Sequence, residues 1–300
     1  AYFLAQSLIY QFDEVTVDRK EYEGDRFDDL AIRADSRLVR RQFKHSADAT
    51  RIFEIEDLIT QRKDLRIDDL IACFKSAGSA VADEYRLCAT WSRPRDPKLV
   101  ALLEEIPAEP SFVGHPTRLY RVRGDLIWPE GGKFSWKPKR AAEFNLSQQD
   151  FLDFTARFVI ELECPSFSGD LSNPGTLVQM LLRLLVNDIG VGQYPNQEIN
   201  VVDVAFSLSE IASQARAGGQ TLKPLEVVAK LRLRTDYGKV AQQFPLVKSE
   251  LVNRVSLLET LHNQVETQSV IVFTGSPGSG KSWTLTCLAE QLKEAGHLVA

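Results

Sequence analysis

Three polar side chains near the start of the sequence, those of Asp29, Gln42 and Lys44, have the types and spacing that could hold a metal ion against a phosphate ester. They lie in two short segments, 29–34 (DLAIRA) and 37–44 (RLVRRQFK), whose residue types favour β-strands. The two residues between the segments, an aspartate and a serine, are typical of a turn. If they form a two-residue hairpin, paired residues have numbers that sum to 71, and Asp29 lies directly opposite Gln42.

The alternation of side chains along a strand gathers the three polar groups on one face of this hairpin. Gln42 and Lys44 are two residues apart and therefore point the same way. Directly opposite side chains have Cβ atoms about 4.5–5.5 Å apart, close enough to share a cation. The apolar residues of the two segments fall on the other face, which suits a core: Leu30, Ile32, Val39 and Phe43. A slip of one residue in the register would separate the trio.

This trio suits metal-dependent hydrolysis of a phosphodiester. Asp29 would bind Mg²⁺, together with the Gln42 side-chain oxygen and a backbone carbonyl such as that of Phe43. Lys44 would orient the attacking water or stabilise the developing charge. Four further acids are candidates to assist the metal site: Glu14, Glu21, Glu23 and Asp28. The alternative is a hairpin with solvated charges and no metal.

A second motif, GSPGSGKS at 275–282, matches the phosphate-binding loop pattern GxxxxGK[ST]. Glycines let backbone N–H groups converge on phosphate oxygens, and the following helix presents its positive end to the same anion. Lys281 would contact the β- and γ-phosphates of ATP, and the Ser282 hydroxyl would bind Mg²⁺. The predicted nucleotide-binding residues are Gly275, Ser276, Gly278, Ser279, Gly280, Lys281 and Ser282.

The sequence ends soon after this loop, without a second acidic strand or an arginine finger. We therefore expect the chain to be the front portion of a longer protein, and we do not expect these residues alone to hydrolyse a nucleotide.

Hydrophobic periodicity predicts an α/β fold with a mixed sheet and flanking helices. A loop-rich region is expected at 106–148 and a connector with some strand character at 220–246. Helices are expected at 1–12, 55–78, 147–162, 175–190 and 250–264, and strands at 14–19, 29–34, 37–44, 84–91 and 269–275.

Composition narrows the class of protein. The net charge of −5 disfavours a generally basic nucleic-acid binder, so contact with nucleic acid would need a local basic patch. The four cysteines show no CxxC spacing, which argues against a zinc site and fits a reducing cytosol. We find no apolar run long enough to span a membrane and no signal peptide, so no membrane partner is expected.

The pattern Asp29 … Gln42-Phe43-Lys44, behind a first helix, resembles the PD-(D/E)XK nuclease superfamily in the subgroup where QxK replaces (D/E)xK. The resemblance implies a restriction-endonuclease-like fold and a Mg²⁺-dependent DNA endonuclease. Glutamine departs from the commoner pattern as a neutral and weaker ligand.

Together with VFTGSPGSGKSWTLTCL, this N-terminus is similar to the bacterial antiviral STAND NTPases, often called Avs proteins. The segments FKHSADATRIFEIEDLI and RLCATW also look like this effector class. The resemblance implies a nuclease domain at 1–225, a connector at 226–246 and the start of a P-loop STAND domain at 247–300. It further implies a cytoplasmic bacterial protein that acts on double-stranded DNA. A phage protein, sensed by a C-terminal region beyond this chain, would drive homo-oligomerisation, for example to a tetramer.

Two other functions stay open. The chain could be a nucleotide-dependent oligomerising scaffold whose first domain binds DNA or a partner without cutting, or an ATP-driven restriction subunit. Two basic regions also carry alternatives. The arginines around the hairpin, Arg33, Arg37, Arg40 and Arg41, either contact phosphates or line a solvated strand face. The segment WPEGGKFSWKPKR at 128–140 either contacts DNA or anchors its aromatic rings on the core.

Overall fold

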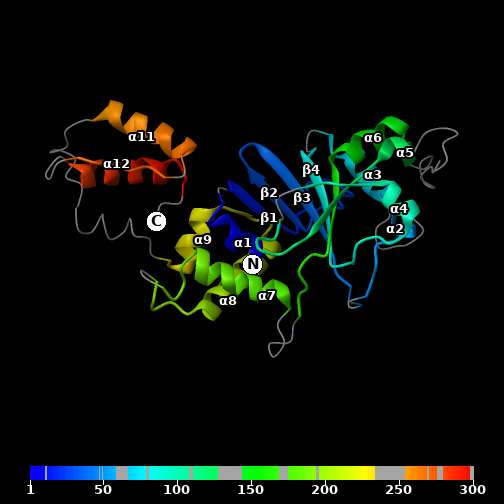
Figure 1. Cartoon of the computed structure of the whole chain (residues 1–300), viewed down its shortest axis with the longest axis horizontal. Helices are drawn as coiled ribbons and strands as arrows, with labels where there is room; N and C mark the ends of the chain where they lie inside the picture. Colours follow the sequence, from blue (N-terminus) through cyan, green and yellow to red (C-terminus); the bar gives the residue numbers. More distant parts are fainter. Residues whose placement is uncertain are drawn as a thin grey trace.

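Figure 1 shows the protein as a computed structural model. The structure describes the chain except for residues 11, 47, 49, 59–66, 79–80, 108–110, 128–143, 169–174, 194–195, 234–253, 269, 276–279 and 298–300. The segment 128–140, with its interleaved aromatic and basic residues, lies outside the described residues.

The described strands form one mixed sheet of eight strands in the order β5-β6-β7-β4-β3-β2-β1-β8. Figure 1 labels β1 to β4 of this sheet. Strands β1, β2 and β3 form an antiparallel meander, and β4 and then β7 join it in parallel. Antiparallel pairs add β6, β5 and β8. The predicted mixed sheet is confirmed. The strands are β1 Glu14–Val17, β2 Leu30–Ala34, β3 Arg37–Lys44, β4 Glu84–Ala89, β5 Leu103–Glu105, β6 Arg118–Val122, β7 Phe158–Leu162 and β8 Thr221–Leu222.

Helices cover both faces of the sheet. Helices α2 to α6 pack on one face, over a core that contains Phe27, Tyr85 and Phe154. Helices α1 and α7 to α9 pack on the other face, over a core that contains Leu30 and Ile32. The bounds are α1 Tyr2–Ser7, α2 Ile55–Leu58, α3 Ile67–Ser76, α4 Pro97–Ala101, α5 Gly124–Ile127, α6 Gln148–Arg157, α7 Thr176–Arg183 with the π-helical segment η2 Leu184–Asp188, α8 Val201–Gly218 and α9 Pro224–Leu231.

The predicted hairpin is confirmed in its register. Leu30 pairs with Arg41 and Ala34 pairs with Arg37, so the paired residue numbers sum to 71, as a two-residue turn at Asp35 and Ser36 requires. Asp35 and Ser36 both have positive φ, 48° and 65°, as the mirror-image turn of a tight hairpin demands. An aspartate tolerates this left-handed conformation better than most residues do. The turn therefore fixes which residues of β2 and β3 face each other.

Several other predicted elements are confirmed in type. Strands β1 and β4 lie within 14–19 and 84–91, and α1 lies within 1–12. The helix predicted at 55–78 is seen as α2 and α3, with residues 59–66 between them outside the described part. It ends close to Gly78, which has a φ of +53°.

The helix prediction for 147–162 is wrong in its second half. Helix α6 ends at Arg157, and Phe158–Leu162 form β7, which is buried along its whole length between β4 and β6. A run of apolar residues that is buried on both faces has no alternating pattern, so it cannot be distinguished from a buried helix by periodicity.

Two regions expected to be irregular hold further elements. Strand β6 and helix α5 lie in the loop-rich region 106–148, and β8 and α9 lie in the connector 220–246. Helix α9 spans the predicted boundary at 225, and its residues Val227 and Leu231 are buried in the core beneath α1 and α8.

The described residues near the phosphate-loop motif form a small core of their own. Helices α11 Val255–Thr267 and α12 Lys281–Glu294 pack through Leu261, Leu288 and Leu292. The prediction of a buried strand at 269–275 is wrong for its described residues. They pair with no other strand, and Val270 and Val272 are each 78% exposed. Their neighbours Ile271 and Phe273 pack on α11 and α12. Exposed and packed side chains therefore alternate along this segment, as they do in an extended chain.

Candidate active site

The hairpin brings Asp29 and Gln42 into contact. Asp29 directly precedes β2, and its backbone carbonyl accepts a hydrogen bond of 3.0 Å from the Asp18 amide at the end of β1. Its Oδ2 atom accepts a hydrogen bond of 2.5 Å from Gln42 Nε2 and one of 2.7 Å from the Phe43 backbone amide. The pairing of β2 and β3 ends at Leu30 and Arg41. Beyond it, the Phe43 amide donates its hydrogen bond to the Asp29 carboxylate instead of to a backbone carbonyl.

Lys44 lies on the same face as Gln42, and Phe43 lies on the other. The Phe43 ring packs against Phe3 of α1 with centroids 6.0 Å apart, which leaves Gln42 and Lys44 on the face of Asp29. The charge of Lys44 lowers the pKa of Asp29, so its ammonium lies within electrostatic reach of the carboxylate. The three residues predicted as the site are thus gathered at one end of the hairpin.

Burial raises the pKa of Asp29 above its usual range. The hydrogen bond from the Phe43 amide opposes this shift, the negative charges of Asp28 and Asp18 add to it, and Lys44 opposes it. A half-buried carboxylate that is surrounded by further acids is costly to ionise without a cation. The site therefore favours a cation beside the Asp29 carboxylate.

The donor set fits a hard divalent cation such as Mg²⁺. The Asp29 carboxylate supplies oxygen, and the Gln42 amide supplies oxygen once it turns, since its nitrogen now faces Asp29. The Phe43 amide points toward β2, whereas the Lys44 carbonyl accepts a hydrogen bond from Thr90 beyond β4. Because the N–H and C=O groups of one strand residue point to the same edge, the Phe43 carbonyl also faces the β2 side.

Asp18 is a further acid close to Asp29 that the sequence analysis does not predict. It faces Asp29 because β1 pairs with β2 up to Val17 opposite Leu30, and the next pair along is Asp18 and Asp29. The register of this second pair of strands was the signal that could have found it. Asp18 also forms an ion pair with Arg216 of α8. Asp28 lies near Asp29 as well, as its effect on the pKa of that carboxyl shows.

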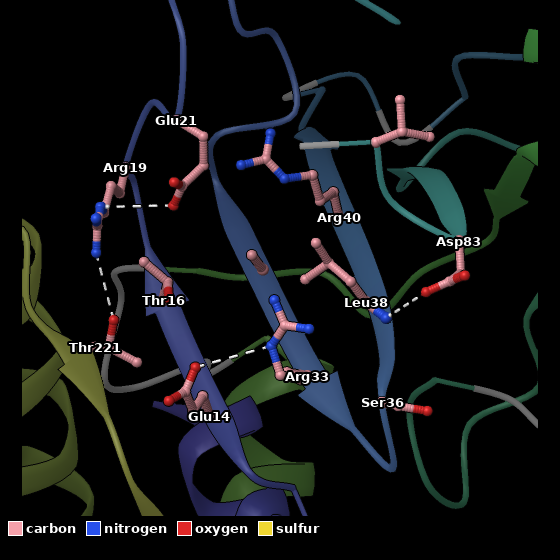
Figure 2. A pocket seen from close by; sticks show the side chains of 12 residues that line it. Glu14, Thr16, Arg19, Glu21, Arg33, Ser36, Leu38, Arg40, Asp83 and Thr221 are labelled. Carbon is pink, nitrogen blue, oxygen red and sulfur yellow. Dashed lines mark hydrogen bonds and ion pairs between the residues drawn. The ribbon is translucent and has the colours of Figure 1, made fainter. Parts of the chain in front are cut away.

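Two other candidate acids are engaged elsewhere. Figure 2 shows a pocket of about 410 Å³ over β1, β2 and β3, on the same face but toward the turn of the hairpin. There Glu14 pairs with Arg33 at 3.9 Å, and Glu21 pairs with Arg19 at 3.5 Å, as the dashed lines mark. Asp29 does not line this pocket. Glu23 is exposed in the loop between β1 and β2.

The prediction of a solvated strand face is wrong for Arg40 and Arg41, because these side chains are 1% and 7% exposed. Burial also keeps Arg40 from the phosphates of a DNA duplex. Arg40 pairs with Asp25 at 2.5 Å and Arg41 with Glu161 at 3.4 Å. The reason is that helices cover the sheet on both sides. The arginines nearer the turn are exposed but also paired, Arg33 with Glu14 at 3.9 Å and Arg37 with Glu84 at 2.6 Å.

The pair of Asp25 and Arg40 anchors the loop that delivers Asp29. Asp25 is 1% exposed and accepts hydrogen bonds from the backbone amides of Glu21, at 3.2 Å, and Phe27, at 3.1 Å. Arg40 precedes Gln42 by two residues on β3 and lies on the same face. The loop between β1 and β2 is thus tied to the strand that carries Gln42 and Lys44.

The phosphate-loop motif is described in part. Gly280 has a φ of +79°, and α12 begins directly after it at Lys281. Lys281 Nζ donates a hydrogen bond of 2.8 Å to the Gly275 carbonyl, and Ser282 is exposed. The predicted residues Ser276, Gly278 and Ser279 lie outside the described residues. The motif's lysine is therefore held across the loop by the carbonyl of its first glycine.

Replacing Asp29 with asparagine is expected to increase the free energy of unfolding at neutral pH in the absence of metal. The folded protein holds the Asp29 proton more tightly than the unfolded chain does, so ionising this carboxyl costs stability as the pH rises. An asparagine keeps an acceptor for Phe43 without that cost. Urea unfolding at neutral and at acid pH measures the difference, which should vanish at a pH where Asp29 is protonated in both states. An Asp13→Asn variant, exposed before β1, is the control. Equal stability of Asp29→Asn and wild type at neutral pH would contradict the assignment.

Comparison of the sequence with models of protein families and with curated proteins found no match. Among the helices that the structure describes, none combines the length and the apolar character of a membrane span.

Proposed function

We propose that the sheet domain is a Mg²⁺-dependent DNA endonuclease and that the motif at 275–282 binds ATP in a regulatory STAND module of an anti-phage defence protein. The observation that carries the first part is the contact of the Asp29 carboxylate with Gln42, beside Lys44 on the same face of the hairpin. This geometry is what the resemblance to QxK nucleases requires, with the acid before one strand and Gln-x-Lys on its partner.

The residues divide the chemistry between binding and charge stabilisation. Asp29 and Gln42 would hold Mg²⁺ through oxygen atoms, with Asp18 or Asp28 as the nearest further acids. When bound, Mg²⁺ lowers the pKa of a water molecule and polarises the scissile phosphate. Lys44 would donate a hydrogen bond to the attacking water or to a phosphate oxygen and would stabilise the charge that develops there.

Cleavage of a supercoiled plasmid tests this proposal. The protein is incubated with the plasmid, ATP and MgCl₂ over a concentration series that reaches the oligomeric range, beside a matched series in EDTA. We expect nicked and linear products in the MgCl₂ series but not in the EDTA series, loss of cleavage in Asp29→Asn, and wild-type cleavage in the control Asp13→Asn. Cleavage by Asp29→Asn at the wild-type rate would refute the nuclease assignment. A wild type that does not cut DNA at concentrations where sedimentation shows the oligomer would leave a scaffold that does not cut.

Lys281→Ala is expected to weaken ATP binding roughly tenfold or more, because a charge-assisted hydrogen bond to the phosphates is lost. Equilibrium dialysis with labelled ATP and Mg²⁺ measures the change. Lys293→Ala, exposed at the other end of α12, is the matched control. If the motif licenses the nuclease, Lys281→Ala also stops plasmid cleavage. Unchanged ATP affinity would contradict the assignment of the loop.

A further inference from the structure

A second cavity, of about 770 Å³, lies on the face of the sheet opposite Asp29. It is bounded by α1 and the turn after it, by β2 to β4 near the hairpin turn, and by the segment 111–114. Its volume lies within the range of small-molecule binding sites. The proposed nuclease chemistry and the phosphate-loop motif use none of its lining residues.

The polar wall of this cavity carries more positive than negative charge. Arg37, Arg41 and Arg86 line it, against the carboxylates of Glu84 and the buried Glu161 behind them. Glu84 accepts hydrogen bonds from Arg37, at 2.6 Å, and from Arg86. Three guanidinium groups and two carboxylates leave an excess of one positive charge. The wall is therefore suited to an anion.

Two of these arginines are held in different ways. Arg41 is 7% exposed, and its guanidinium carbon lies 5.0 Å from the centre of the Phe3 ring. Its Nη1 donates hydrogen bonds to Ser111 Oγ, at 2.8 Å, and to Glu161, at 3.4 Å. Its position is thus fixed before any ligand arrives. Arg37 stands at the mouth with 60% of its side chain exposed and is held by Glu84 alone among the described acids. It can swing toward an anion at little cost.

Another part of the lining is aromatic. Tyr10, which is 44% exposed, and Phe12 line the same cavity from the turn after α1. Exposed aromatic rings offer surfaces on which a planar ring can stack. A cavity that is lined by guanidinium groups and by aromatic rings suits a ligand that carries both a phosphate group and a planar ring.

We propose that this cavity binds a nucleoside monophosphate, with its phosphate on Arg37 and Arg41 and its base on Tyr10 and Phe12. The same chemistry is present at the 5′-phosphorylated end of a nucleic-acid strand, which is a second source of such a group. The site is separate from the phosphate loop at 275–282, and it does not depend on the proposed nuclease function.

Isothermal titration with adenosine 5′-monophosphate in EDTA tests the proposal. EDTA removes metal-dependent binding, and the Lys281→Ala background disables the phosphate loop. We expect saturable binding that Arg37→Ala weakens roughly tenfold or more. Tyr10→Ser should weaken binding of the nucleotide but not of inorganic phosphate. Arg33→Ala, exposed and ion-paired on the other face, is the matched control.

A 5′-phosphorylated dinucleotide in the same titration distinguishes the two sources. Tighter binding of the dinucleotide would assign the site to strand ends, and weaker binding would assign it to free mononucleotides. No saturable binding at millimolar ligand overturns the proposal. Binding that neither Arg37→Ala nor Tyr10→Ser alters overturns it as well.

Discussion

Lys44→Met is expected to lower the rate of DNA cleavage by about 10²–10³-fold, the usual cost of losing one group that stabilises charge in the transition state. The positive charge of Lys44 lowers the pKa of Asp29, and Lys44 shares the hairpin face with Gln42. Methionine keeps the length and the apolar stem of lysine but removes the ammonium. Since Asp29 and Gln42 are untouched, metal binding should persist while catalysis is lost.

The experiment follows plasmid cleavage under single-turnover conditions and measures Mn²⁺ affinity on the same samples. Lys98→Met, exposed on α4, removes a lysine far from the hairpin and should cut as the wild type does. A Lys44→Met variant that cuts at the wild-type rate would mean that the Lys44 ammonium has no role in catalysis. Loss of metal binding together with cleavage would instead show that the variant disturbs the hairpin.

Asp25→Ala is expected to destabilise the fold by about 3–5 kcal/mol, because it leaves Arg40 as an unpaired charge in the core. Arg40 is 1% exposed and pairs with Asp25 at 2.5 Å, and its Nε has no partner among the described residues. Asp25 also holds the amides of Glu21 and Phe27, so the loop before Asp29 should loosen as well. Urea unfolding measures the loss of stability.

The double variant Asp25→Asn/Arg40→Met separates charge from structure. It removes both charges and keeps an acceptor for one of the two loop amides, so it should recover part of the lost stability. Glu105→Ala, which breaks an exposed ion pair with Arg118, should unfold at nearly the wild-type urea concentration. If Asp25→Ala unfolds where the wild type does, the buried pair does not anchor the loop.

The hairpin and the contact at its end could be predicted from the sequence because the constraints are local. A two-residue turn at Asp35 and Ser36 permits one register, and that register alone places Asp29 against Gln42. The role of the Phe43 amide follows from the same geometry but was not foreseen, since the prediction considered only side chains and the carbonyl.

What could not be predicted depends on how distant segments pack. The burial of Arg40 and Arg41 requires partners on the loop before β2 and on β7, and neither lies near them in sequence. The sequence of β7 predicts the end of a helix instead of a strand, because burial on both faces removes the alternation that marks a strand. Asp18 was missed because its relation to Asp29 depends on the register of a second strand pair.

The most direct test of the central claim locates the metal itself. Fe²⁺ replaces Mg²⁺ at oxygen-rich sites, and with ascorbate and peroxide it produces radicals that cut the polypeptide next to the bound ion. Without nucleotide, we expect cuts near Asp29 and near Gln42 to Lys44, suppressed by excess Mg²⁺ and absent in Asp29→Asn. Cuts elsewhere only, or cuts at these positions that persist in Asp29→Asn, would show that the hairpin holds no metal and would contradict the nuclease account.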